Sequence, residues 1–458
     1  MEKHCCRILS PCGILGYGFP EESFENGLAQ EPDAIVVDAG STDAGPHKLG
    51  AGVAIVSRMA YKRDLQRLVL AGVARKIPVI IGSAGGSGAK KHVDWTLDIL
   101  REITEEHQLQ YKLCVISADI PKETVRQKLR RGEVNKLSAS VPELTEESLN
   151  RTGDIVAQMG YEPVLEALKE GADVIICGRA YDPAPFAAVG IFMGFDPALS
   201  LHMGKILECG ALCAEPGTTK DCIVGELFPG YFEVYPTNPA RRVSQISVAA
   251  HTFYEKDHPY RLYGPGFLLC LEDCRYERLE NGHVKVSGSR MERIPGTVKL
   301  EGAALTAYRT FVIGGVRDKI LISRLEEVED GVAESVRGQY HDISEERYQI
   351  RFINYGLNGV MGELETASKE GVHEVGVLFE VTADTQELAD ILCSSLRSTF
   401  MHFGYEGRKS TAGNLAFPFA PSDISFGPVY EFSVYHLMRV DSATELFPAR
   451  YEEIGGAV

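Results

Sequence analysis

The feature that most constrains the fold is a repeat in the first half of the chain. Each repeat consists of a short apolar run, a loop of small and polar residues, and an amphipathic segment. Short apolar runs occupy residues 34–37, 78–81, 111–117 and 172–177, and each ends in a loop of small and polar residues. Amphipathic segments with apolar residues three or four apart cover residues 62–76, 93–107, 122–131 and 163–170. This alternation predicts an α/β fold, a parallel doubly wound sheet with helices on both faces.

The pattern changes at about residue 225. Expected strands at 243–250, 299–309, 375–382 and 429–439, with a helix at Gln386–His402, are typical of a mixed sheet. A chain of 458 residues is also too long for one ordinary core. We therefore predict an N-terminal α/β domain at residues 1–224 and a second mixed α/β domain at residues 225–458.

The charge of the chain limits its partners. It has 47 basic and 64 acidic side chains and a net charge of -17, which makes nucleic acid an unsuitable partner. A small anionic substrate remains compatible, because backbone amides and arginines can create a local positive site. No apolar stretch reaches the roughly 18 residues of a membrane span, and the first residues do not resemble a signal peptide. We expect a cytoplasmic protein that does not contact membranes.

The loops that follow parallel strands should meet at one edge of the sheet, because right-handed crossovers place all the strand ends there. The first polar loop, within VVDAGSTDAGPHKLG at residues 36–50, contains Asp38, Ser41, Asp43 and His47. These side chains can act as acid, base or hydrogen-bond donor. The alternative is a structural turn in which Asp38 and Asp43 cap a helix or form an Asx-turn.

The second loop, GSAGGSG at residues 82–88, is similar to an anion cradle at a helix N-terminus. The predicted substrate-binding residues here are Ser83, Gly85, Gly86 and Ser87. The loop lacks the Gly-Lys-Ser/Thr ending of a P-loop and the spacing of a dinucleotide fingerprint, so no ATP or NAD site is predicted. The alternative is a tight turn that needs small residues.

The third loop, CGRAYDPAPF at residues 177–186, places two opposite charges at a strand end. Arg179 can bind a carboxylate bidentately, and Asp182 can take a proton or hold a metal. The alternative is a mutual salt bridge that fixes the loop. Glu208, in GKILECGAL, adds another acid. A divalent metal is compatible with these acids, and no particular cofactor is indicated.

These motifs, taken in order, resemble the acyclic terpene utilisation family. The resemblance rests on VVDAGSTDAGPHKLGAG, GSAGGSG, GADVIICGRAYDPAPF and GKILECGAL, and it covers roughly residues 8–315. It implies an N-terminal α/β domain and a catabolic role on carboxylic acids or their coenzyme A thioesters, in a family first linked to bacterial breakdown of citronellol and geraniol. The residues that match motif positions are Asp43, His47, Ser83, Arg179, Asp182 and Glu208.

The resemblance also implies a partner. Longer members of the family carry a further domain of about one hundred residues, an ordinary domain size. Short members resemble one half of a two-gene pair. We therefore expect a small separate subunit to complete the enzyme, and we expect the chain itself to form a homo-oligomer, as large families of this kind often do.

Together these features predict a lyase, hydratase or isomerase that acts on a small di- or tricarboxylate or an acyl-CoA thioester. Arg179 and the amides of residues 83–88 would bind the carboxylate, and Asp43 or His47 would move a proton next to it. Asp182 or Glu208 would be the partner acid or a metal ligand.

Two other functions remain open. The first is a serine-type hydrolase with Ser41, Ser83 or Ser87 as nucleophile and His47 as base, although none of these serines lies in a Gly-x-Ser-x-Gly elbow. The second is a non-catalytic subunit whose glycine-rich loops bind a nucleotide or thioester.

Overall fold

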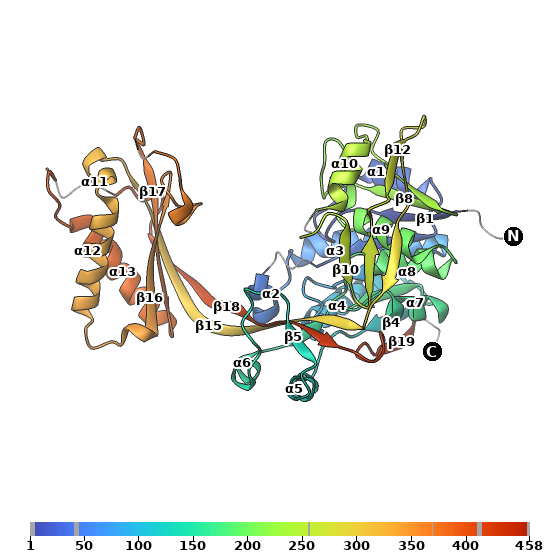
Figure 1. The fold of residues 1–458 in the computed structure, drawn as a ribbon, viewed down its shortest axis with the longest axis horizontal. Coiled ribbons are helices and arrows are strands. Elements are labelled where there is room, and N and C mark those ends of the chain that lie inside the picture. The colour runs from blue at the N-terminus through green and yellow to red at the C-terminus, as the bar shows by residue number, and fades with distance from the viewer. Residues whose placement is uncertain (1–4, 41–44, 255–256, 369, 410–414, 456–458) are drawn as a thin grey trace. The chain divides into compact units, whose positions relative to one another are not determined.

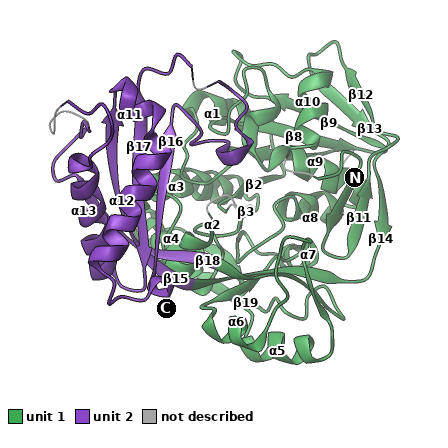
Figure 2. Cartoon of the chain, turned by 60° about the vertical axis from the view of Figure 1, so that its left-hand side comes forward, with its two compact units in different colours: residues 1–304, 432–458 green, residues 305–431 purple. Residues whose placement is uncertain are grey.

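The chain folds into two compact units. The computed structural model describes residues 5–40, 45–254, 257–368, 370–409 and 415–455. Unit 1 comprises residues 1–304 and 432–458, and unit 2 comprises residues 305–431 (Figure 2). Residue 225, where the sequence analysis placed a boundary, lies inside β8 (Ile223–Phe228), which pairs with β1 (Cys6–Ser10). Strands expected in a second domain therefore extend the sheet of the first.

The main sheet of unit 1 has a parallel centre. Its parallel strands run in the order β1, β2 (Ala34–Asp38), β3 (Val79–Gly82), β7 (Val174–Cys177) and β4 (Tyr111–Ile116). Figure 1 labels the outer two of these strands, β1 and β4. Antiparallel strands extend it at both sides: β8, β9 (Tyr231–Pro236), β13 (Val284–Ser287) and β12 (Arg275–Arg278) beyond β1, and β19 (Ala449–Ile454) beyond β4. The predicted α/β class is confirmed.

Both faces of the parallel centre are buried, which explains its unbroken apolar runs. Val36 and Ile80 point into one core, while Val37 and Ile81, one residue along each strand, point into the other. Buried residues of helices complete both cores. The first core contains residues of α5 (Lys122–Arg130), α7 (Glu162–Lys169), α8 (Ala184–Phe192) and α9 (Pro197–Leu207), and the second contains residues of α1 (Glu21–Leu28), α3 (Arg58–Arg75) and α4 (Lys90–His107).

One predicted strand in unit 1 is wrong. Residues 243–250, expected to be extended, belong mostly to the helix α10 (Gln245–Thr252). Ser244 begins this helix with a capping box, in which its hydroxyl accepts a hydrogen bond from the amide of Ser247 at 3.1 Å. A serine pair at this spacing is a helix-start signal, and it outweighs the β-branched residues on either side.

Unit 2 combines long strands with helices, among them the short α11 (Lys319–Ser323). The predicted helix Gln386–His402 is confirmed as α13 and lies with α12 (Leu325–Gln339) over a shared apolar core. The other three predicted strands lie within β15 (Thr297–Val316), β17 (Val375–Ala383) and β18 (Asp423–Arg439), and β16 (Tyr348–Tyr355) pairs antiparallel with β17. The chain passes between the units through β15 and β18.

Candidate functional site

The loops at the carboxyl ends of the parallel strands pack tightly against one another, as expected. A Cβ atom placed on Gly40, after β2, would lie 2.3 Å from the Cβ of Ser83, after β3. One placed on Gly88 would lie 2.1 Å from the backbone nitrogen of Arg179, after β7. Only glycine allows these approaches, so the small residues bring distant polar groups together.

Arg179 is the centre of this region. Its side chain is 1% exposed, and its Nε donates to Oε2 of Glu301 at 3.0 Å. Its Nη1 donates to Oγ of Ser83 at 3.0 Å and to Oδ1 of Asp182 at 3.2 Å. Three predicted site residues are therefore in direct contact. Arg179 is therefore paired with carboxylates of the protein. This is the mutual salt bridge that was the alternative interpretation of the loop, and it stands in place of the open clamp expected for a substrate carboxylate.

Ser83, which contacts Arg179, has a constrained backbone conformation. Its φ of 46° lies in the left-handed region, which is unfavourable for a residue with a side chain. Its hydroxyl accepts hydrogen bonds from Arg179 and from the backbone amide of Ala180 at 3.2 Å. Because Ser83 is fully buried and already occupied, it is poorly placed to act as a nucleophile.

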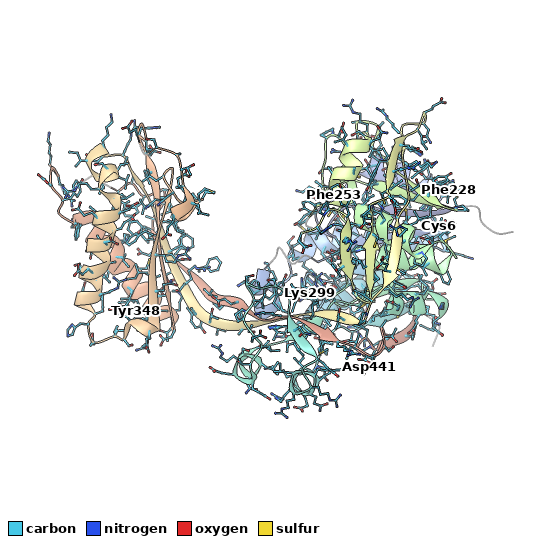
Figure 3. All side chains as sticks on the ribbon, viewed as in Figure 1. Cys6, Phe228, Phe253, Lys299, Tyr348 and Asp441 are labelled. Carbon is cyan, nitrogen blue, oxygen red and sulfur yellow. The ribbon has the colours of Figure 1, made fainter. Side chains whose placement is uncertain are left out.

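Glu301 is a site residue that the sequence analysis missed. It lies on β15, where it pairs with Val156 of β6 (Ile155–Ala157), and Nζ of Lys299 is 2.9 Å from its Oε1. Burial alone would raise its pKa, but Arg179 and Lys299 hold the pKa of Glu301 at about 2. Figure 3 labels Lys299 on this strand. The sequence signal that could have identified Glu301 is the pair of charged residues Lys299 and Glu301, two positions apart in a strand whose Val298 and Leu300 are apolar.

Asp38 is a buried carboxyl at the last position of β2. It is 5% exposed, and its Oδ1 accepts hydrogen bonds from the backbone amides of Ala39 at 2.9 Å and Gly40 at 3.3 Å. Burial, followed by the negative charge of Asp182, raises the pKa of Asp38 well above its usual value, although Arg179 opposes this. Asp38 therefore retains its proton more strongly than a surface aspartate does.

A buried ion pair lies close to Asp38. Lys205, near the end of α9, is 2% exposed and donates to the carboxylate of Glu208, which is 4% exposed. The negative charge of Glu208 also contributes to the raised pKa of Asp38. Glu208 is thus linked electrostatically to the buried charge cluster. Lys205 was missed, although a lysine three residues before a glutamate on a helix indicates a pair.

The loop at residues 83–88 is a packed turn and not the expected anion cradle. Its amides already donate within the protein, from Ala84 to the carbonyl of Cys177 at 3.0 Å and from Gly85 to the hydroxyl of Tyr61 at 3.3 Å. The amides of Gly86 and Gly88 donate to carbonyls of the same loop. Every residue of the loop is buried, so the small residues serve packing.

The N-terminus of the following helix is also occupied. The backbone amide of Lys90, the first residue of α4, donates to Oδ1 of Asp119 at 2.9 Å. Asp119 comes from the loop after β4, so a carboxylate of the protein lies where a bound anion was expected.

The remaining predicted residues lie elsewhere. Ser87 places its Oγ 2.6 Å from Nδ1 of His92, on α4, a histidine that the sequence analysis did not consider as a base. His47 is half-buried on the short helix α2 (Gly45–Ala51). Ser41 and Asp43 lie outside the described residues.

Within residues 5–40, 45–254, 257–368, 370–409 and 415–455, no group of three or more His, Cys, Asp and Glu side chains is arranged to hold a metal ion. In the same part of the chain, every helix is too short or too polar to cross a membrane.

These features define an α/β protein with a buried charge cluster at the carboxyl ends of its parallel strands, where open α/β sheets bind ligands. The chain belongs to the acyclic terpene utilisation family: the family described as acyclic terpene utilisation family protein AtuA matches residues 7–223 and 234–422. The match extends past residue 315, the limit of the resemblance seen in the motifs. Neither the curated proteins nor the solved structures that were searched gave a match.

Proposed function

We propose that this protein is a catabolic lyase, hydratase or isomerase that moves a proton on a small di- or tricarboxylate or an acyl-CoA thioester. The observation that carries the proposal is Asp38, a carboxyl that is 5% exposed at the carboxyl end of β2 and whose pKa is raised by burial and by the charge of Asp182. A carboxyl with a raised pKa keeps its proton to higher pH than an ordinary aspartate and can then protonate a leaving hydroxyl or a carbanion. Such acid catalysis is worth about 10²- to 10⁴-fold in rate.

Asp182 supplies the complementary group. It is 30% exposed, and its charge acts on Asp38. It therefore combines contact with the buried cluster and access from solvent. We assign Asp182 as the carboxylate partner of Asp38, and we retain Asp43 and His47, which follow β2 in the sequence, as alternative bases.

We propose that Arg179 is a positioning residue in place of a substrate clamp. It forms ion pairs with Asp182 and with Glu301, so it fixes the distance between these two carboxylates. Its charge also limits how far the pKa of Asp38 is raised. A bidentate arginine between two carboxylates is well suited to such a role.

The substitution Asp38→Asn tests the proposal. A thermal-shift screen of acyl-CoA thioesters and dicarboxylates first identifies a ligand, since a ligand at one hundred times its Kd stabilises the fold by about 2.7 kcal/mol. We expect turnover of the ligand to fall by at least about 100-fold in Asp38→Asn. Asp98→Asn, at a surface position with the side chain 64% exposed, is the matched control and should leave turnover unchanged. Turnover within a few-fold of the wild type in Asp38→Asn would rule out its role as the acid.

A serine-type hydrolase is the second candidate, favoured by the contact of 2.6 Å between Ser87 Oγ and His92 Nδ1. Burial lowers the pKa of His92, so the ring is neutral and can accept the serine proton. A fluorophosphonate probe should label the wild type and Ser83→Ala but not Ser87→Ala. Absence of labelling in the wild type would eliminate this candidate.

The remaining proposals concern partners. We expect from the family resemblance that a small separate subunit completes the enzyme, and co-purification with its neighbouring gene product would test this. A divalent cation at Asp182 or Glu208 is compatible with the same proton transfer and would make turnover sensitive to EDTA.

A further inference from the structure

Lys205 has more hydrogen-bond donors than acceptors around it. Its ammonium group carries three N–H bonds, and Glu208 is the one acceptor recorded for Nζ among the described residues. The side chain is 2% exposed, so bulk water cannot easily satisfy the other two. Leaving buried polar N–H groups unpaired is costly, so a further oxygen acceptor is expected beside Lys205.

His251 and Tyr254 lie beside the same ammonium group. Nζ of Lys205 is 5.7 Å from the centre of the Tyr254 ring, and the ring of His251 stacks on Tyr254 with centroids 5.6 Å apart. The ammonium group of Lys205 and the imidazole of His251 therefore both lie near the ring of Tyr254. Burial, and then the charge of Lys205, lowers the pKa of His251 to about 4, so the imidazole is neutral at neutral pH.

His251 can accept a hydrogen bond from a ligand. His251 is 6% exposed, and its Nε2 is buried with no hydrogen-bond partner among the described residues. The backbone carbonyl of Ile206 lies beside the ring and favours its protonation. A neutral imidazole has one donating nitrogen and one accepting nitrogen, so one N–H can donate to the carbonyl of Ile206 while the other nitrogen remains as an acceptor for a guest.

We propose that Lys205 and His251 form a binding subsite for a small hydroxycarboxylate. Lys205 donates to the carboxylate oxygen, His251 accepts from the neighbouring hydroxyl, and Tyr254 covers the pair. The inference rests on the proposed function, because Glu208, which holds Lys205, also acts electrostatically on Asp38. The subsite is thus linked electrostatically to the proposed proton donor through Glu208, and it deepens the substrate class of the proposed function.

Malate and succinate are matched probes, because they differ by one hydroxyl group. By isothermal titration at neutral pH, we expect the wild type to bind malate at least about tenfold more tightly than succinate, since a site built to pair a hydroxyl discriminates against a ligand without one. His251→Phe keeps the stacking on Tyr254 and removes the acceptor. It should abolish the preference for malate and leave succinate binding unchanged.

The double variant Lys205→Met/Glu208→Gln tests the cation without leaving a buried charge unpaired. We expect it to lose at least about tenfold in affinity for both probes, the loss typical of one charge-assisted hydrogen bond. Lys90→Met/Asp94→Asn removes an exposed ion pair of the same kind and should change neither affinity. Circular dichroism verifies the fold of each variant, and His251→Phe still tests the subsite if the double variant does not fold.

The outcomes separate this inference from the proposed function. Equal or absent binding of malate and succinate by the wild type would overturn the subsite, as would unchanged binding by the folded double variant. Asp38→Asn should bind malate as the wild type does. If Asp38→Asn retained both malate binding and turnover, the proton-donor proposal would fail while the subsite would stand.

Discussion

Nε of Arg179 and Oε2 of Glu301 lie 3.0 Å apart, with the two side chains 1% and 5% exposed. The pair joins the loop after the parallel strand β7 to the antiparallel strand β15, 122 positions further along the chain. A buried charge pair has a large effect when one member is removed, because the other is left in the interior without a partner.

The first prediction concerns this pair. Glu301→Ala should lower the free energy of unfolding of unit 1 by about 3–5 kcal/mol, whereas Arg179→Met/Glu301→Leu should cost less than the single change. Urea denaturation followed by fluorescence of Trp95, the one tryptophan of the chain, reports on unit 1. A single change that cost less than about 1 kcal/mol would show that the pair contributes little.

The second prediction concerns acid stability. The pKa of Glu301 is about 2 in the folded protein and 4.5 in the reference state, so its contribution is complete above pH 4.5 and is lost as the pH falls towards 2. The stability difference between the wild type and Glu301→Gln should therefore shrink across this interval. Urea titrations at several pH values measure it, and a difference that stayed constant down to pH 2 would contradict the lowered pKa.

The third prediction has the opposite sign. The pKa of Asp38 is raised in the folded protein, so folding holds its proton more tightly than the unfolded chain does. The stabilisation of the wild type relative to Asp38→Asn should be fully present below pH 3.8, the pKa of an aspartate in the unfolded chain. It should be lost as the pH rises through the raised pKa of the folded protein. The same titrations, extended to alkaline pH, measure this. A difference that increased with pH would mean that the buried carboxyl prefers its ionised form.

The fourth prediction isolates the close contact at Gly88. Gly88 and Gly132 have similar positive φ values of 65° and 68°, but a Cβ on Gly88 would lie 2.1 Å from the Arg179 nitrogen, whereas one on Gly132 would meet nothing within 4 Å. Alanine at Gly132 should cost about 1–2 kcal/mol from the backbone alone. Alanine at Gly88 should cost at least about 2 kcal/mol more. Equal losses of stability in the two variants would mean that the loops at the strand ends can move apart.

The parallel centre of the sheet was predictable because burial on both faces gives its strands continuous apolar runs. The runs at 34–37 and 78–81 correspond to β2 and β3 within one residue. The strands that extend the sheet were assigned to another domain, because antiparallel neighbours such as β8 carry no sequence mark of the strand they will join. Pairing partners are a property of the tertiary fold.

The candidate site was predictable only where it follows the parallel strands. The contact between Arg179 and Asp182 needs only local spacing, and it was one of the two interpretations of that loop. Glu301 could not be found this way, because it comes from the middle of a strand in another part of the chain. The loop at 83–88 had two interpretations, because close packing and anion binding both require small residues.

The protonation state of Asp38 is the central claim and can be measured directly. Infrared difference spectra of the wild type minus Asp38→Asn, recorded from acidic to alkaline pH, should keep the carbonyl stretch of a protonated carboxyl well above pH 3.8, the usual value for an aspartate, because burial and Asp182 raise the pKa of Asp38. The band should disappear as the pH is raised further. Loss of the band at or below pH 3.8 would contradict the raised pKa and would remove the proposed proton donor.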